Sequence, residues 1–378
     1  MPERAPAIVS LPWQQLWLVA ALRHSALPEL DEGRVPELIG VARSEGVLLL
    51  AESQLQSHPQ RASVNSAVLH ELEQAAHADM LEQLAMLAEQ AKVFRALSEA
   101  EFPFLVMKGG ALAHWLYAQP ALRVVTDLDI LIPGKAHLPA LQSVLTAIGY
   151  AAVPGNSMAI ETSFEKPGGP YGRFVVDAHW QLFNSMQLRN LFSYAELQAQ
   201  ALQLPGHAGV FGLSPVHALF NACGHRAIGL PHTGVQGLQA ANALRWLWDV
   251  HALTQCLTEQ QWQHVLTLAA EKQLSALMHE ALSTVQQHFA SHLPEALLSN
   301  LLQQSALEAH QLRSFTHWRR YQWQEFMASA PHWPGRLRWL WHTVSLDSPS
   351  TQARYGHQGG RFGRYARRLL AALKRVVQ

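Results

Sequence analysis

Cysteine is almost absent from this chain, and its scarcity excludes several structural classes. The two thiols, Cys223 and Cys256, lie far apart in apolar segments of helical character. Such a pair provides neither the dense disulfide framework of small secreted domains nor the ligand spacing of a zinc knuckle. We therefore expect two buried, reduced thiols in a cytoplasmic protein.

An excess of charge of either sign is also missing. Basic and acidic residues number 28 each, so no global basic field points to a nucleic-acid partner. No uncharged apolar run approaches the roughly 20 residues of a transmembrane helix. The N-terminal stretch LPWQQLWLVAALRHSALPEL is interrupted by prolines and glutamines and lacks a basic leader, which predicts an amphipathic helix and not a signal peptide. The 21 histidines make the net charge sensitive to mild acid.

About half of the 378 residues are apolar, enough for a sizeable core in two or three domains. Residues 1–100 read as a helical region, and its clearest segment ends before Pro103. Apolar residues there recur every three or four positions, which predicts one buried stripe on a long helix. The stripe comprises Leu69, Leu72, Ala76, Met80, Leu84, Leu87, Ala91 and Phe94.

From residue 101 to about 200 the pattern predicts a small mixed α/β core. Strands are expected at FPFLVMK, VVTDLDILIP, MAIETSFEK and GRFVVDAHWQLF, and helices at GGALAHWLY and AHLPALQSVLTAIG. PGGPY joins the last two strands as a hairpin. Helical periodicity returns over 201–345, and 346–378 is a basic tail that is either solvated or in weak contact with RNA or an anionic membrane. The fold class is therefore α+β, a small mixed-sheet core flanked by N-terminal and C-terminal helical regions.

Two aspartates interrupt a strand that is otherwise apolar. Asp127 and Asp129 stand two positions apart, so they share one face of the strand, and Leu128 and Ile130 share the other. Asp177, in FVVDAHW, is framed in the same way. If the two strands are neighbours, three carboxylates converge, and oxygen ligands of this kind suit Mg²⁺ or Mn²⁺ in a two-metal displacement at phosphorus. The alternative is that the aspartates are solvated strand-edge or turn residues.

The segment VMKGGALAHWLY places Lys108, Gly109 and Gly110 between a strand and a helix. Amides at a helix N-terminus bind anions, and glycine lets a phosphate approach. A plain strand-to-helix connection is the alternative. Arg123 reads either as a phosphate ligand or as a surface arginine, and His179 either as a site residue or as a packed histidine.

The order Lys-Gly-Gly, TDLDILIP and VDAHW resembles an uncharacterised nucleotidyltransferase family of the polymerase-beta-like superfamily. ELIGVARSEGVLLLAESQL and LRWLWDVHAL resemble its flanking helices, so that the resemblance covers about residues 35–260. It implies that Asp127, Asp129 and Asp177 are catalytic and bind the metal, with Asp177 also able to act as base. It assigns substrate binding to Lys108, Gly109, Gly110, Arg123, Thr126 and His179.

The implied activity is a metal-dependent transfer of a nucleoside monophosphate from a nucleoside triphosphate such as ATP to an acceptor hydroxyl, with release of pyrophosphate. The acceptor is a small molecule, a sugar, a protein or RNA. Many superfamily members carry Gly-Ser where this chain has Gly109 and Gly110, which removes one hydroxyl that would touch phosphate. The alternatives are a toxin-type nucleotidyltransferase acting on transfer RNA and a non-catalytic binding module with this fold. His217, His225 and the tryptophans of LRWLWDV are interpreted as packing or surface residues.

Overall fold

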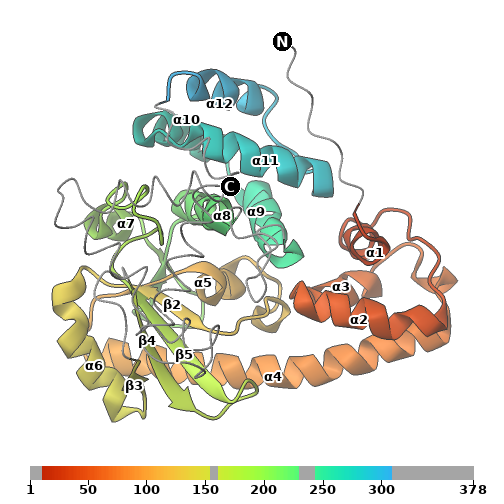
Figure 1. Ribbon diagram of the computed structural model, residues 1–378, viewed down its shortest axis with the longest axis horizontal. Helices are drawn as coiled ribbons and strands as arrows, with labels where there is room; N and C mark the ends of the chain where they lie inside the picture. The colour runs from red at the N-terminus through yellow and green to blue at the C-terminus, as the bar shows by residue number, and fades with distance from the viewer. Residues whose placement is uncertain (1–10, 154–160, 230–242, 309–378) are drawn as a thin grey trace, which may run out of the picture.

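The computed structural model describes residues 11–153, 161–229 and 243–308, which form a mixed sheet with helices on both faces (Figure 1). The predicted α+β class is confirmed. The predictions for 309–378, including the last helices and the basic tail, lie outside the described residues. Within the described part of the chain no helix has the length and apolarity to cross a membrane.

The N-terminal helical region contains α1 (Trp13–Leu22), α2 (Val35–Ser44), α3 (Leu48–Gln56) and the 34-residue α4 (Ser66–Glu99). α4 runs beneath both this region and the sheet (Figure 1). The predicted stripe is buried at Leu72, Ala76 and Phe94, but the prediction is wrong at Leu84, which is 51% exposed. Polar Gln83 and Glu89 are buried instead because each meets partners from the sheet side of the helix.

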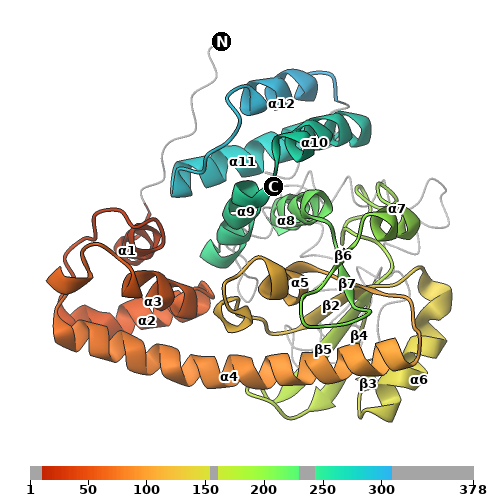
Figure 2. The ribbon, with the colours of Figure 1, turned by 180° about the vertical axis from the view of Figure 1, so that it is seen from behind.

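In the described ranges seven strands form one sheet, in the order β3-β4-β5-β2-β1-β7-β6. The pairs β2–β5 and β1–β7 are parallel and the other four are antiparallel. The last two strands follow residue 200, so the sheet extends past the expected core into the next region (Figure 2). The strands are β1 (Leu105–Val106), β2 (Leu128–Leu131), β3 (Ala151–Ala152), β4 (Glu161–Pro167), β5 (Arg173–His179), β6 (Leu202–Gln203) and β7 (Phe211–Gly212).

The alternation along β2 separates its side chains as the sequence predicts. Leu128 and Ile130 enter a hydrophobic cluster with residues of α4 and of α6 (Leu138–Ala147), whereas Leu131 belongs to the cluster on the other face. The predicted hairpin is also present, because β4 and β5 pair antiparallel across the turn of Gly168 to Gly172. Gly169, at φ +73°, packs on the Phe174 ring.

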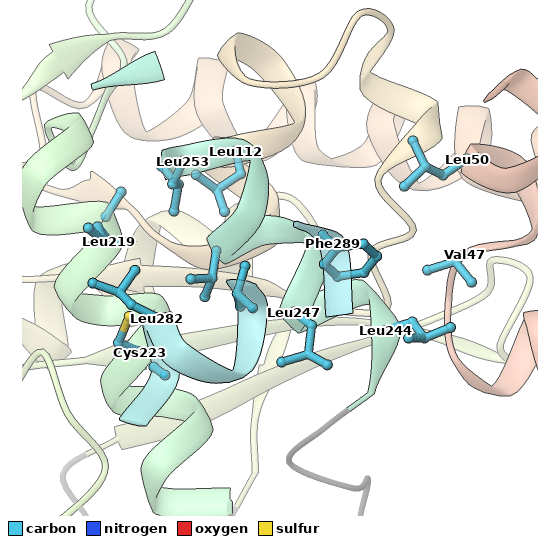
Figure 3. Close-up of a cluster of buried hydrophobic side chains, with 14 of the residues drawn as sticks. Val47, Leu50, Leu112, Leu219, Cys223, Leu244, Leu247, Leu253, Leu282 and Phe289 are labelled. Carbon is cyan, nitrogen blue, oxygen red and sulfur yellow. The ribbon is translucent and has the colours of Figure 1, made fainter. Parts of the chain in front are cut away.

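Five helices follow the core in the described residues. They are α8 (Pro215–Gly229), α9 (Leu244–Cys256), α10 (Glu259–Lys272), α11 (Ser275–Phe289) and α12 (Leu297–Ser305), after the short α7 (Tyr194–Ala199). Of these, α8 and α9 lie on the side of the sheet that carries Asp129, and the other three pack on them and on one another (Figure 1). Their leucines share one cluster with α3 and with α5 (Lys108–Trp115) (Figure 3). Cys223 is buried and free as predicted, but Cys256 is free and exposed because it ends α9.

Gly224 of α8 has no room for a side chain, because an added methyl group would overlap the Phe183 ring. We expect Gly224→Ala to lower the free energy of unfolding by about 1–3 kcal/mol through overpacking. Gly40 of α2 is the matched control, since nothing lies within 4 Å of its added methyl group. Gly40→Ala should gain up to about 1 kcal/mol of helix propensity. Urea unfolding measures both, and a loss of similar size in the two variants would contradict the packing argument.

His217 is 1% exposed in α8, with Nδ1 3.0 Å from the Ser214 hydroxyl, and burial lowers its pKa to about 4. Between this value and the unfolded pKa of about 6.5 the unfolded chain binds more protons, so stability falls as the pH drops. We expect His217→Gln to reduce that slope by up to about 1.4 kcal/mol per pH unit in urea unfolding between about pH 7 and 5. An unaltered slope in His217→Gln would show that the ring already titrates in the folded protein.

Candidate active site

Three carboxylates meet on neighbouring strands. Asp129 of β2 and Asp177 of β5 are direct partners in the parallel register. Asp127 lies one residue before β2 and is half-buried, while Asp129 is 6% exposed. The strands β2 and β5 are therefore neighbours, as expected, and the three candidate catalytic residues lie at the same edge of this pair.

Asp129 is neutralised within the protein. Its Oδ1 accepts from Lys108 Nζ at 2.6 Å and lies 2.7 Å from His179 Nε2. Burial by itself would raise the pKa of Asp129, but the charge of Lys108 and the bond to His179 hold it well below its usual range. Lys108 keeps a raised pKa despite its own burial because of Asp129. Its backbone is left-handed, at φ +49°, a strained conformation for a residue with a side chain.

The burial of the other two carboxylates is compensated less completely. Burial and then repulsion by Asp129 raise the pKa of Asp127 to about 6. Burial also raises the pKa of Asp177, against the hydrogen bond from Ser163. Asp177 Oδ1 is buried with no hydrogen-bond partner among the described residues. A buried, unpaired carboxylate oxygen next to two further carboxylates is the kind of donor that a hard cation requires.

The donor chemistry therefore fits Mg²⁺ or Mn²⁺. In the present arrangement, however, no three acidic, histidine or cysteine side chains of the described ranges are close enough together to hold a metal ion. The ammonium group of Lys108 lies against Asp129 in the place where a cation would act. The metal and the roles of its three candidate ligands stay predictions.

Gly109 and Gly110 lie in the first turn of α5, and both are packed. A Cβ on Gly109 would lie 3.0 Å from the Arg123 guanidinium carbon, and one on Gly110 would lie 3.0 Å from a methyl carbon of Leu128. This packing explains why Gly110 replaces the serine found in many superfamily members, since the Cβ of a serine would press on Leu128 of the buried strand β2. Both residues line a cavity, so their backbone can still approach a ligand.

Arg123 is buried and forms an ion pair with Asp249 of α9, with NH2 2.7 Å from Oδ2. The Tyr117 hydroxyl donates to Oδ1 of the same aspartate at 2.6 Å. Arg123 also lines the cavity beside the carboxylates. Its guanidinium is therefore held in place by Asp249, and this pair ties the loop before β2 to the C-terminal helices.

The same loop is held from the opposite side by α4. The backbone N–H of Val125 donates to Gln83 Oε1 at 2.8 Å, and Gln83 Nε2 donates to the Tyr171 hydroxyl at 2.9 Å. Thr126, the next residue, is exposed, with its hydroxyl 3.4 Å from Asp127 Oδ1. The position of Asp127 is thus fixed by helices on both sides of the sheet.

His179 is engaged through both ring nitrogens. Nε2 contacts Asp129, and Nδ1 lies 3.2 Å from Glu161 Oε2 at the start of β4. The contact with Asp129 positions that carboxylate. Glu161 was not among the predicted residues, and the cross-strand register of β4 and β5, which sequence spacing does not reveal, places it opposite His179.

Two adjoining cavities open beside Asp129. The first cavity, of about 280 Å³, is bounded by α5, by residues 123–127 and by α8 and α9. The second cavity, of about 270 Å³, is bounded by His179, by residues 182–184 and by the same two helices. Lys108, Asn221, His225 and Trp246 line both.

Several of these lining residues were missed or read differently in the sequence. His225, interpreted as a packing or surface residue, lines both cavities, and burial lowers its pKa to about 3, which keeps the ring neutral. Trp246 also lines both, whereas Trp248 packs on Phe289 as expected. Arg245 faces the first cavity and packs on Gly46 of the loop between α2 and α3. These residues belong to α8 and α9, which lie far from Asp127 and Asp129 in the sequence. Sequence spacing alone therefore did not associate the two sets of residues.

The chain belongs to a family described as uncharacterised nucleotidyltransferases, whose model matches residues 31–310. Among solved structures it is similar to the crystal structure of an antigenic nucleotidyltransferase-like protein from Paracoccidioides brasiliensis, at 17% identity and a TM-score of 0.30. That match covers 51% of this chain and 92% of the other. No curated protein matches the chain.

The buried pair of Arg123 and Asp249 is expected to dominate the stability of this region. Asp249→Asn leaves the guanidinium buried without its counter-charge and should cost about 3–5 kcal/mol. The exposed pair of Arg43 and Asp79 is the matched control, and Asp79→Asn should cost less than about 1 kcal/mol. Urea unfolding of the two variants makes the comparison. Equal losses would mean that burial of the first pair adds nothing.

Proposed function

We propose that this protein transfers a nucleoside monophosphate from a nucleoside triphosphate to an acceptor hydroxyl, releasing pyrophosphate. The observation that carries the proposal is the in-register placement of Asp129 beside Asp177 on parallel strands, with Asp127 at the start of the same edge. Membership of a nucleotidyltransferase family supports the same reaction class.

The first cavity offers what a polyphosphate needs. Lys108, Arg123 and Arg245 supply positive charge, and the first turn of α5 presents the backbone of Gly109 and Gly110. The electrostatic balance is also suitable, since the groups around Asp127 and Asp177 offset the cost of their burial only in part, and a cation accompanying the nucleotide would add positive charge. Lys108 Nζ lies 2.6 Å from Asp129 Oδ1. Its charge therefore lies between the carboxylates and the position proposed for the phosphates.

In the proposed reaction the acceptor oxygen bonds to the α-phosphorus while the bond from that phosphorus to the bridging oxygen breaks. The electron pair leaves with pyrophosphate, and the hydroxyl proton passes to a carboxylate. Asp177 is the candidate for this base because its Oδ1 has an unused acceptor position. Mg²⁺ or Mn²⁺ held by Asp127, Asp129 and Asp177 would stabilise charge on the attacking and leaving oxygens. His179 and Lys108 orient Asp129.

The test is calorimetric titration of ATP, GTP, CTP and UTP in the presence of Mg²⁺, on the wild type and on the double variant Asp127→Asn, Asp129→Asn. We expect metal-dependent binding of at least one nucleotide, weakened at least about tenfold, or about 1.4 kcal/mol, in the double variant. The reason is that amides replace two anionic oxygen donors without changing their size.

Asp79→Asn serves as the charge-matched control, since Asp79 pairs with Arg43 at the surface and not with the site. Circular dichroism and urea unfolding check that each variant is folded. If the wild type binds none of the four nucleotides with either Mg²⁺ or Mn²⁺, the transferase proposal fails, and a binding module with this fold becomes the better interpretation.

A further inference from the structure

We infer that the donor nucleotide spans both cavities, with its polyphosphate in the first cavity and its nucleoside in the second, and that Asn221 contacts it where the two cavities meet. The inference rests on the proposed function. Its starting observation is that each cavity has a different chemistry although they share the wall formed by Lys108, Asn221, His225 and Trp246.

The two cavities differ in charge. The first has Arg123 and Arg245 on its lining in addition to the shared Lys108. The second adds no lysine or arginine of its own among the described residues, and its walls include Leu182, Phe183 and Ile228. A triphosphate requires cations and backbone donors, whereas a nucleobase and ribose require apolar faces with a few polar groups.

The volumes of the two cavities also favour one ligand that spans both. Each cavity, at about 280 and about 270 Å³, is below the roughly 300–1,000 Å³ of small-molecule sites, and the two together lie inside that range. One ligand extending across both is therefore better matched than two separate ligands. Lys108 at the junction, bonded to Asp129, would then lie beside the α-phosphate, which is where the carboxylates are required.

Asn221 provides an independent indication of a ligand. Its side chain is 3% exposed and lines both cavities, and it has no hydrogen-bond partner among the described residues. The amide is not among the fully enclosed unpaired atoms of the described residues, so it is open to the cavities, where a ligand can reach it. An amide both donates and accepts, so it suits a ribose hydroxyl or the edge of a base.

Flat surfaces for a base are also present. Trp246 lines both cavities, and the His225 ring stands nearly perpendicular to it, at 82° and a centroid distance of 4.7 Å. The Arg245 guanidinium carbon lies over the same ring, 5.5 Å from its centroid, so His225 and Arg245 together fix the indole plane. Asn184, exposed and bonded to Glu161 at 3.1 Å, lies at the rim of the second cavity, where a bulkier side chain would enter it.

The test compares nucleoside triphosphates with inorganic tripolyphosphate, which has no nucleoside. Calorimetry with Mg²⁺ is run on the wild type, on Asn184→Trp, which fills the second cavity from its rim, and on Asn221→Leu, which removes the amide at nearly constant volume. We expect both variants to weaken the preferred nucleotide at least about tenfold and tripolyphosphate by less than about twofold.

Two controls sharpen the comparison. Asn184→Ala loses the same bond to Glu161 without adding bulk, so it should bind both ligands nearly as the wild type does. Ala222 lines the first cavity and not the second, so Ala222→Leu should weaken tripolyphosphate and nucleotide alike.

Nucleotide affinity that is unchanged in Asn184→Trp and Asn221→Leu would overturn the inference while leaving the proposed function intact. Equal weakening of tripolyphosphate and nucleotide by Asn184→Trp would also overturn it, because the polyphosphate would then occupy the second cavity. Failure of the wild type to bind any nucleoside triphosphate would remove the proposed function, and this inference with it.

Discussion

The buried carboxylate of Asp129 is the constraint around which this structure is arranged. A charge at 6% exposure is tolerated only with partners, and Lys108 and His179 provide them from two different elements. The contact with Lys108 requires that residue to enter α5 in a left-handed backbone conformation. The contact with His179 requires β2 and β5 to be adjacent and parallel. A helix, a neighbouring strand and the third carboxylate thus all meet at this one buried charge.

A second buried pair extends this constraint to the helical regions. Arg123 and Asp249 hold the loop before β2 against α9, while Gln83 holds the same loop against α4. The loop carries Asp127, whose position therefore depends on helices that lie before and after the core in sequence. The hydrophobic cluster that contains α5 likewise includes residues of α1–α3 and α8–α12. The helices before and after the core thus share one core with it.

Some of the fold and the site could be predicted from particular residues. The alternation of Leu128 and Ile130 with Asp129 predicted which face is buried under α4 and α6, because the period of a strand is local. PGGPY predicted a hairpin because its glycines adopt backbone angles that other residues avoid. Leu84 of α4 was misassigned because the helix changes partners along its length, and its second half buries Gln83 and Glu89, which the sheet satisfies.

The sequence by itself determined the type of chemistry at this site: three aspartates in strand contexts, a Lys-Gly-Gly turn and an α+β order of elements. These signals are local, since each depends on residues a few positions apart. The tertiary structure alone decided that Lys108 neutralises Asp129, that Arg123 is held by Asp249, and that Asn221, His225 and Trp246 line two adjoining cavities. Such contacts join residues from distant parts of the chain, and they are set by strand register and helix packing, which no short-range pattern encodes.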